Sequence, residues 1–380
     1  MQAADIIVVG AGMGGASAAA LLAKDARVIL LERESHPGYH STGRSAALFS
    51  ATYGNHVVRM LTRASRAYFE SNAEGMTEHP ILTPRGLLHF ALPEQLAALD
   101  AMWAEVRPRA PDIQRVDARD ALKLHPALRP DQIQGGIYEP DAMDMDVHAL
   151  HEAYLRRLRA DGGKLVVNAA VESIERGAVW TVRTPAGDFA APLLVNAAGA
   201  WADDLAWRAG IPLIGLEPKR RTAFLVSAPA RTDISAWPMA INVEETFYFK
   251  PDAGKIFVSP ADETPSPPCD CQPDDFDVAV AVDRLEQATT ITVNRVEHKW
   301  AGLRSFVADR SPVVGFDRRA EGFFWLAAQG GYGIHTAHAL ARCAQTLLLS
   351  NRMPEEVLSL GVDAAMLSPA RFETAAAGEP

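Results

Sequence analysis

The first 34 residues consist of short apolar runs separated by glycines and polar positions. The β-branched run at 5–9 is typical of a buried parallel strand. Glycines cluster at 10–15, and small residues and leucines follow at 16–24, which predicts a tight turn into a helix packed on a sheet. Residues 27–31 predict a second strand. The order strand, turn, helix, strand predicts a βαβ unit.

Helical and extended patterns continue to about residue 215. The segment 35–56 is rich in Gly, Ser and Thr, and we expect a long loop with a short helix that begins near Ser41 or Thr42. Apolar positions at helical spacing predict helices at 57–70, 93–106, 117–124 and 146–161. Extended patterns predict a strand pair within 80–92, strands at 164–168 and 193–198, and a hairpin of 180–183 with 188–191.

The middle of the chain, roughly 215–300, has a different character. The segments TAFLVS, TFYFKP, KIFVSP and ITVNRVE alternate between apolar and polar positions, which predicts an antiparallel sheet. A Pro- and Asp-rich loop interrupts it at 262–275. After 300, we expect a strand at 323–328, a glycine turn at 329–333, a helix at 334–349 and a loose tail at 367–380. The fold class is therefore predicted to be α/β, with a Rossmann-type domain and an α+β second domain that carries the antiparallel sheet.

Composition narrows the classes of function. The chain has 380 residues and a formal net charge of −10, which disfavours nucleic acid and anionic membranes as main partners. Three cysteines, Cys269, Cys271 and Cys343, exclude a disulfide framework and favour a reducing compartment. Residues 6–23 are uncharged, but no Lys or Arg precedes them and glycines fill their middle, so we expect neither a signal peptide nor a transmembrane segment.

The glycine turn carries the first candidate chemistry. Gly10, Gly12 and Gly15 fit G-x-G-x-x-G, whose glycines permit a tight turn, approach of a pyrophosphate and close helix–strand packing. Glu32 follows 22 residues after Gly10, where its carboxylate can accept hydrogen bonds from ribose hydroxyls and would repel a 2′-phosphate. The pattern predicts dinucleotide binding and does not separate FAD from NAD. The loop HSTGRS at 40–45 is equally consistent with a phosphate contact and with a solvated turn.

Several blocks, in the same order along nearly the whole chain, resemble a known group of flavoenzymes. VVGAGMGGAS, LLERE and PGYHSTGRSAA resemble the FAD-dependent D-amino acid oxidase superfamily. VNAAGAWADDLA, PKRRTAF, ETFYFKP, WAGLRSFVADRSPVVGF and AAQGGYGIHTA resemble its bacterial D-arginine dehydrogenase-like branch. The resemblance implies an FAD-binding domain made of 1–80, 141–215 and 300–380, and a substrate-binding domain made of 81–140 and 216–299.

The same resemblance implies a set of residues around non-covalent FAD. The glycine turn would hold the ADP half, the loop after 40 would follow the pyrophosphate and flavin, and the glycines after 329 would face the flavin pyrimidine edge, at the start of a helix whose dipole favours negative charge. The implied residues are Gly10, Gly12, Gly14, Gly15, Glu32, Arg33, Ser41, Thr42, Arg44, Ser45, Ala46, Ala47, Leu48, Val171, Gly199, Ala200, Trp201, Gly330, Gly331, Tyr332, Gly333 and Ile334.

The resemblance also implies the substrate contacts. Arg221 and Arg304 would grip the substrate carboxylate, because a planar guanidinium makes paired hydrogen bonds to it. Tyr53 and Tyr248 would add hydroxyl contacts beside the flavin-facing Gly331. Without the resemblance, the alternatives that stay open are a solvated or surface-paired role for the arginines and sheet packing for the tyrosines. The segment 50–56, which begins with the pocket residue Ser50, resembles a loop that closes over the site, with Gly54 and Asn55 as a hinge.

Two departures from the branch concern the substrate. Leu87 stands where arginine-preferring members carry an acidic residue, and Leu48 stands where the branch has a histidine. Both changes make the pocket more apolar, and a desolvated guanidinium without a carboxylate partner is unfavourable. We therefore expect oxidative deamination of neutral D-amino acids, such as leucine, methionine, phenylalanine or proline, over D-arginine and D-lysine.

Other assignments stay open or negative. The alternatives are a secondary-amine oxidase of sarcosine or proline type, and a non-catalytic flavoprotein. No buried carboxylate or histidine is evident as a base for the substrate amine, and no metal site is expected from the pairs His148/His151 and His335/His338. The electron acceptor (quinone, O₂ or a dye) is not assigned. A cytoplasmic location is expected, with peripheral association with the inner membrane as an alternative.

Overall fold

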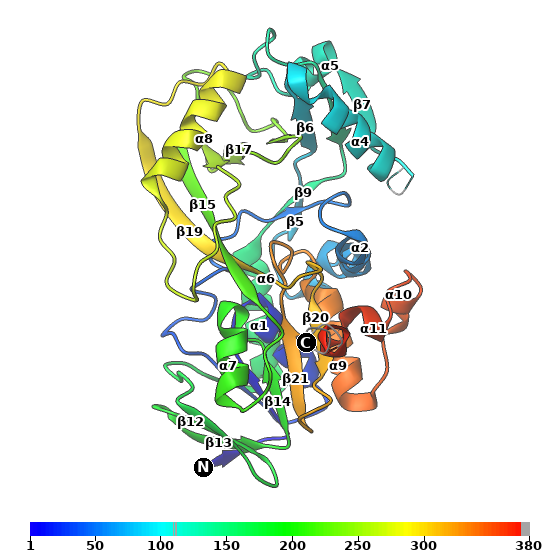
Figure 1. The fold of residues 1–380 in the computed structure, drawn as a ribbon, viewed down its shortest axis with the longest axis vertical. Helices are drawn as coiled ribbons and strands as arrows, with labels where there is room; N and C mark the ends of the chain where they lie inside the picture. Colours follow the sequence, from blue (N-terminus) through cyan, green and yellow to red (C-terminus); the bar gives the residue numbers. More distant parts are fainter. Residues whose placement is uncertain (109, 111, 374–380) are drawn as a thin grey trace, which may run out of the picture.

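The structure is a computed structural model that describes residues 1–108, 110 and 112–373. Two large sheets dominate it, one in each half of the molecule, and the long strands β15 and β19 run between the halves (Figure 1). The part of the predicted tail beyond 373 lies outside the described residues. Between 367 and 373 the chain forms a short 3₁₀ helix, η3 (Pro369–Phe372).

The first sheet has six strands in the order β10-β3-β2-β14-β21-β20, and β20 is its antiparallel edge strand. The four strands at its centre, β2, β3, β14 and β21, are buried almost throughout, which explains their near-continuous apolar sequences. The strands are β2 (Ile6–Val9), β3 (Val28–Leu31), β10 (Lys164–Val166), β14 (Leu193–Asn196), β20 (Val313–Phe316) and β21 (Phe323–Ala327).

Helices cover one face of this sheet, and a smaller sheet covers the other. The helices α1 (Met13–Leu22), α6 (Val147–Ala160) and α9 (Ala337–Ser350) share one apolar core with β2 and β3. The alanines of α1 permit this close packing. On the opposite face lie α7 (Ala202–Arg208) and the four-stranded sheet of β1 (Gln2–Ala3), β11 (Ser173–Arg176), β12 (Trp180–Thr184) and β13 (Gly187–Ala191).

The second sheet has eight strands in the order β19-β15-β18-β17-β16-β6-β8-β7. It is antiparallel except where β16 runs parallel to β6. The strands are β6 (Leu87–Ala91), β7 (Gln114–Asp117), β8 (Gly135–Glu139), β15 (Glu217–Ser227), β16 (Met239–Asn242), β17 (Tyr248–Asp252), β18 (Lys255–Ser259) and β19 (Val296–Phe306).

The two faces of the eight-stranded sheet have different partners. The helices α5 (Ala118–Leu124) and α8 (Asp275–Ala288) pack on one face with Leu88 and Phe90. Leu87 and Tyr248 belong to a separate apolar cluster, and both residues line a small cavity on that side of the sheet. Because successive side chains of a strand point to opposite faces of the sheet, one face of the second sheet lies at the candidate site.

The remaining elements connect the two sheets and complete the fold. They are β4 (Leu48–Phe49), β5 (Leu82–Pro84), β9 (Met143–Met145), α2 (His56–Glu70), α3 (Asn72–Gly75), η1 (Pro93–Gln95), α4 (Leu96–Val106), η2 (Gly199–Trp201), α10 (Glu355–Leu358) and α11 (Ala364–Leu367).

The mixed α/β fold is confirmed, and four local predictions are wrong. No helix begins at Ser41 or Thr42, where the chain makes consecutive turns. The strands within 80–92 do not pair with each other, because β5 pairs with β9 and β6 pairs with β8 and β16. The strand predicted over ITVNRVE begins only at Val296. The last long helix begins at Ala337, after a run of turns. The division into two domains stays a prediction.

Candidate active site

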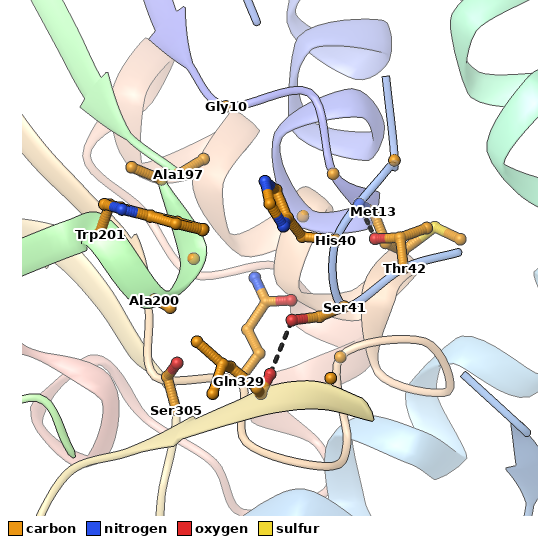
Figure 2. Close-up of a pocket in the computed structure, with 18 of the residues that line it drawn as sticks. Gly10, Met13, His40, Ser41, Thr42, Ala197, Ala200, Trp201, Ser305 and Gln329 are labelled. Atoms are coloured by element: carbon orange, nitrogen blue, oxygen red, sulfur yellow. Dashed lines mark hydrogen bonds between the residues drawn. The ribbon is translucent and has the colours of Figure 1, made fainter. Parts of the chain in front are cut away.

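A cavity of about 420 Å³ opens at the carboxyl ends of β2, β3, β14 and β21 (Figure 2). This edge is where open α/β sheets bind ligands. The glycine turn, the segment after β3, the loop at 38–46 and the turn after β21 all contribute walls. The predicted cofactor residues that line it are Gly10, Gly12, Gly14, Glu32, Arg33, Ser41, Thr42, Arg44, Ser45, Ala46, Val171, Gly199, Ala200, Trp201, Gly330, Gly331, Gly333 and Ile334.

The glycine turn is shaped so that its backbone borders the cavity. Gly10 has φ +102°, and a Cβ there would lie 2.4 Å from the carbonyl oxygen of Ala197. A Cβ at Gly15 would lie 1.8 Å from the carbonyl oxygen of Gly10, so Gly15 serves close packing and does not line the cavity. Gly12 lines the cavity, and a Cβ there would meet Thr42 Oγ1 at 3.3 Å. These contacts fit the turn-and-approach geometry of a pyrophosphate cradle.

Glu32 is held at the end of β3 by two backbone donors. Its carboxylate accepts hydrogen bonds from the amides of Ala11 at 2.9 Å and Glu34 at 3.0 Å, and the residue is 7% exposed. Burial raises the pKa of Glu32, and the two backbone hydrogen bonds oppose the shift. Because Glu32 lines the cavity, its remaining acceptor positions are available to hydroxyl groups of a ligand.

The loop after residue 38 is anchored by the hydroxyls and the arginine that the sequence singled out. Thr42 Oγ1 accepts from the amide of Met13 at 2.9 Å, and Ser41 donates to the carbonyl of Leu303 at 2.6 Å (Figure 2). The Arg44 guanidinium donates to the carbonyls of Cys271 and Ala301 at 2.9 and 2.8 Å and pairs with Asp270. Arg44 therefore lines the cavity while its charge holds the 269–271 loop.

Aromatic side chains form another part of the cavity wall. The Arg33 guanidinium lies 4.7 Å from the centre of the Trp201 ring, and the His40 and Trp201 rings are also 4.7 Å apart. Figure 2 shows His40 and Trp201 bordering the same space. His40 was not singled out from the sequence except as part of the HSTGRS loop.

A smaller chamber of about 70 Å³ adjoins the large cavity. The two share as walls Ser45, Ala46, Arg221, Tyr248, Arg304, Gly331 and Ile334. Ala47, Leu48, Ser50, Tyr53 and Leu87 line the small chamber alone. The structure thus brings every predicted catalytic and substrate-pocket residue to one place, next to the cavity that borders the glycine turn.

Arg304 is the central cation of the chamber. Its Nη1 donates to the Tyr53 hydroxyl at 3.0 Å, and its Nη2 to the Tyr248 hydroxyl at 3.4 Å. Among the described residues no carboxylate pairs with it. Burial works against its charge, but the neighbouring tyrosine hydroxyls raise the pKa of Arg304 above its usual range. A guanidinium of this kind is suited to an anionic ligand.

Arg221 lies beside Arg304 and keeps part of its charge for a ligand. Its Nε donates to the Asp262 carbonyl at 2.9 Å, and its Nη2 lies 3.2 Å from Glu263. Glu263 also pairs with Arg310 at 2.8 and 3.0 Å, so one carboxylate serves two arginines. The three arginines have only the carboxylate of Glu263 to pair with among the described residues, so this group of side chains has an excess of positive charge.

The excess positive charge affects the pKa of Tyr248. Burial favours its neutral form, yet Arg304 and Arg221 lower the pKa of Tyr248 below its usual value. Gly331 makes room for the arrangement, because a Cβ there would lie 2.8 Å from Arg304 Nη1 and 3.1 Å from the Tyr53 hydroxyl.

Some predicted contacts are placed differently. Tyr332 lines neither cavity; its ring packs against Tyr53 at 5.0 Å and Phe306 at 6.0 Å. Asn55 caps α2 by accepting from the amide of Val58 at 3.0 Å, so it anchors the end of the 50–56 segment. The residues 330–334 precede α9 by a series of turns and do not form its first turn.

The chamber contains polar residues that sequence reasoning missed. His89 and His335 are buried and line it, although no buried histidine was evident from the sequence. His89 stands two positions after Leu87 on β6, so strand periodicity could have placed both on the same face. Glu245 also lines the chamber and is exposed, and no sequence pattern indicated that it would lie there. Ser50 lines the chamber, but its hydroxyl already donates to Glu139 at 2.8 Å.

No group of His, Cys, Asp and Glu suited to a metal ion occurs within the described residues. The three cysteines are free, and Cys271 is buried. Across the same described residues, no helix is long and apolar enough to cross a membrane.

The glycine turn, Glu32 and the cavity at the carboxyl ends of the first sheet's strands are those of a dinucleotide-binding protein. Residues 5–347 match the DAO family model, described as FAD dependent oxidoreductase, and the chain belongs to that family. Its cofactor is FAD, which the residues around the glycine turn fit.

Curated relatives are similar at about a quarter identity. L-2-hydroxyglutarate dehydrogenase of Escherichia coli strain UMN026 is 25% identical over 56% of this chain and 50% of its own length. Monomeric sarcosine oxidase of Arthrobacter sp. is 26% identical over 57% of this chain and 56% of its own. The chain thus spans about half the length of these relatives. Glycine oxidase of Geobacillus kaustophilus is 24% identical over 87% and 89% of the two chains.

Solved structures share the fold over nearly the whole chain. The crystal structure of glycine oxidase from Geobacillus kaustophilus aligns with a TM-score of 0.83 and 22% identity, covering 98% of this chain and 99% of the other. L-proline dehydrogenase from P. horikoshii aligns with a TM-score of 0.80 and 19% identity, with the same coverage. At these identities the alignments establish the fold alone.

Proposed function

We propose that the protein catalyses FAD-dependent oxidative deamination of D-amino acids, as a dehydrogenase or oxidase of the D-arginine dehydrogenase-like branch. The observation that carries the proposal is the pair Arg221 and Arg304 at the junction of the two cavities. One end of that junction borders the predicted flavin-facing turn, and the other borders a small apolar chamber. A 2-amino acid has the matching parts: a carboxylate, a reacting Cα and a side chain.

Each residue has a defined part in the proposed reaction. Arg221 and Arg304 bind the carboxylate, and Tyr53 and Tyr248 orient Arg304 and add hydroxyl contacts. The chemistry that FAD supplies when bound is acceptance of a hydride at N5. The substrate ammonium gives up one proton, and the Cα–H bond gives up a hydride. The resulting imino acid takes up water and releases ammonia and a 2-oxo acid.

The side-chain preference follows from the chamber walls. Leu48 and Leu87 form an apolar part of its wall together with Met239 and Ile241, and the exposed residue Glu245 also lines it. A guanidinium or ammonium desolvated against these apolar residues would be unfavourable, because the one carboxylate that lines the chamber among the described residues, Glu245, is exposed and its charge is screened by solvent. We propose neutral D-amino acids as the substrates, with non-covalent FAD and a cytoplasmic location.

A secondary-amine oxidase is the second candidate. Monomeric sarcosine oxidase is among the relatives, and sarcosine is a secondary amine whose carboxylate the same arginine pair would suit. The non-catalytic flavoprotein is less well supported, because an unpaired buried arginine has no evident purpose in it.

A steady-state panel with an artificial electron acceptor tests the proposal. The purified holoenzyme is assayed with neutral D-amino acids, their L-enantiomers, D-arginine, D-lysine, sarcosine, L-proline and L-2-hydroxyglutarate. We expect the highest kcat/KM with a neutral D-amino acid. A kcat/KM for D-arginine above that of every neutral D-amino acid would contradict the assigned side-chain class, and exclusive turnover of N-methyl amino acids would select the second candidate.

A further inference from the structure

His89 is a buried histidine whose ring makes no hydrogen bond within the described chain. It is 5% exposed, and neither Nδ1 nor Nε2 has a partner among the described residues. It lines the small chamber beside Leu87. A buried polar group without a partner is unfavourable, so such a group at a cavity wall is suited to pair with a ligand.

Sheet geometry fixes where His89 points. On β6, Leu87 and His89 face the chamber, while Leu88 and Phe90 pack into the core on the other side. The neighbouring strand β16 places Met239 beside Leu87 and Ile241 beside His89, and both residues also line the chamber. His89 is therefore a polar group set among apolar side chains.

The protonation state of His89 limits what it can bind. Burial lowers the pKa of His89 to about 4, so the imidazole is neutral at pH 7. A neutral imidazole offers one donor and one acceptor nitrogen. This suits an uncharged hydroxyl or carboxamide better than an anion or a cation.

A second buried histidine lies at another part of the chamber. His335 is 2% exposed, and its two ring nitrogens also lack partners among the described residues. Its ring lies 6.0 Å from that of Tyr332 and 5.9 Å from that of Tyr53, the residue that helps to orient Arg304 in the proposed function.

Ser45 and Glu245 also line the chamber, but both residues are exposed. Ser50 lines it as well, but its hydroxyl already donates to Glu139. His89, on the eight-stranded sheet, is therefore the buried group left for the substrate side chain, since its ring has no partner among the described residues.

We propose that His89 is a specificity-determining residue that hydrogen-bonds an uncharged polar group on the substrate side chain. The inference rests on the proposed function and narrows its substrate class to D-amino acids with a hydroxyl or carboxamide. D-Threonine and D-asparagine are then better substrates than D-valine and D-leucine, which have nearly the same shapes without the polar group.

The test compares these matched pairs in the wild-type holoenzyme and in His89→Val. We expect wild-type kcat/KM to favour the polar member of a pair. In His89→Val, the polar-to-apolar ratio should fall by about tenfold or more, the factor that corresponds to loss of one buried hydrogen bond. His89→Gln keeps a donor and an acceptor and should retain part of the preference, which also serves if the valine variant binds FAD poorly.

His125→Phe is the matched control. His125 is 0% exposed and has two unpartnered ring nitrogens among the described residues, but it packs against Trp237 and Phe249 and does not line the chamber. Its substitution should leave the ratios unchanged.

The outcomes separate this inference from the proposed function. Ratios that are the same in wild type, His89→Val and His89→Gln, with D-amino acids still oxidised, would overturn the role of His89 and leave the function standing. A wild-type enzyme that prefers the apolar member of both pairs would overturn it too. Absence of turnover for every D-amino acid would instead reject the proposed function, and this inference with it.

Discussion

At the scale of single residues, the chamber is organised by Arg304. It donates to two tyrosine hydroxyls and forms no ion pair with a carboxylate of the described chain, while its neighbour Arg221 shares Glu263 with Arg310. An excess of buried positive charge is costly unless an anion completes it. The arrangement therefore favours substrates that bring a carboxylate.

Replacement of Arg304 by Met should weaken substrate capture without loss of FAD. Removing one member of a buried charge pair costs about 2–5 kcal/mol, so kcat/KM should fall by roughly 30-fold to several thousand-fold. The flavin absorbance per protein should stay unchanged. The control is Arg220→Lys, because Arg220 pairs with Asp262 and Asp277 and lines neither cavity. A kcat/KM for Arg304→Met within threefold of wild type would show that this guanidinium does not bind the carboxylate.

At the scale of elements, the βαβ unit shows what could be predicted from the sequence, and the β15–β19 pair shows what could not. The unit 5–31 is local, so its apolar runs and glycines determine its strands, turn and helix. The arginine pair depends on register: Arg221 lies opposite Gly302, and Lys219 opposite Arg304, which makes the two arginines diagonal neighbours. No local pattern contains that register, so their proximity was implied only by the family resemblance.

The glycine turn provides a prediction at this scale. Gly15→Ala puts a methyl group where the Gly10 carbonyl oxygen now lies, 1.8 Å from the Cβ position, so the turn and α1 must move apart. We expect the variant to be purified with little FAD, seen as a reduced ratio of flavin to protein absorbance. Gly177→Ala is the control, because the nearest atom to its Cβ is a carbonyl oxygen at 3.8 Å. Full FAD content in Gly15→Ala would contradict the assigned packing role.

At the scale of the whole molecule, the sequence predicted the α/β class and missed the long-range pairings. The segment 80–92 was expected to fold back on itself, but β6 pairs with β8 and with β16, about 150 residues further along the chain. Those pairings place His89 in the chamber, where the sequence had not predicted a polar group. The wrong pairing within 80–92 therefore has a physical cause, because the partners of β6 are distant in sequence.

The buried histidines make the stability of the fold sensitive to acid. Burial lowers the pKa of His125 to about 3, below the usual 6.5. A group whose pKa is lower in the folded state favours folding fully above its unfolded pKa and progressively less as pH falls toward the folded value. Between pH 7 and pH 5, His125 binds a proton in the unfolded state and stays neutral in the folded state. This difference alone should lower the free energy of unfolding by about 2 kcal/mol.

Denaturant unfolding of the holoenzyme at the two pH values measures this effect. The loss of unfolding free energy between pH 7 and pH 5 should be smaller by about 2 kcal/mol in His125→Phe than in wild type. An equal loss in both proteins would mean that His125 is not kept neutral by its surroundings.

The central claim is that the flavin site oxidises neutral D-amino acids, and an anaerobic absorbance titration of the purified protein tests it most directly. Single additions of neutral D-amino acids, such as D-asparagine and D-methionine, should bleach the oxidised flavin band, while their L-enantiomers leave it unchanged. A flavin band that no D-amino acid bleaches, but that sarcosine, L-proline or L-2-hydroxyglutarate does, would contradict the account.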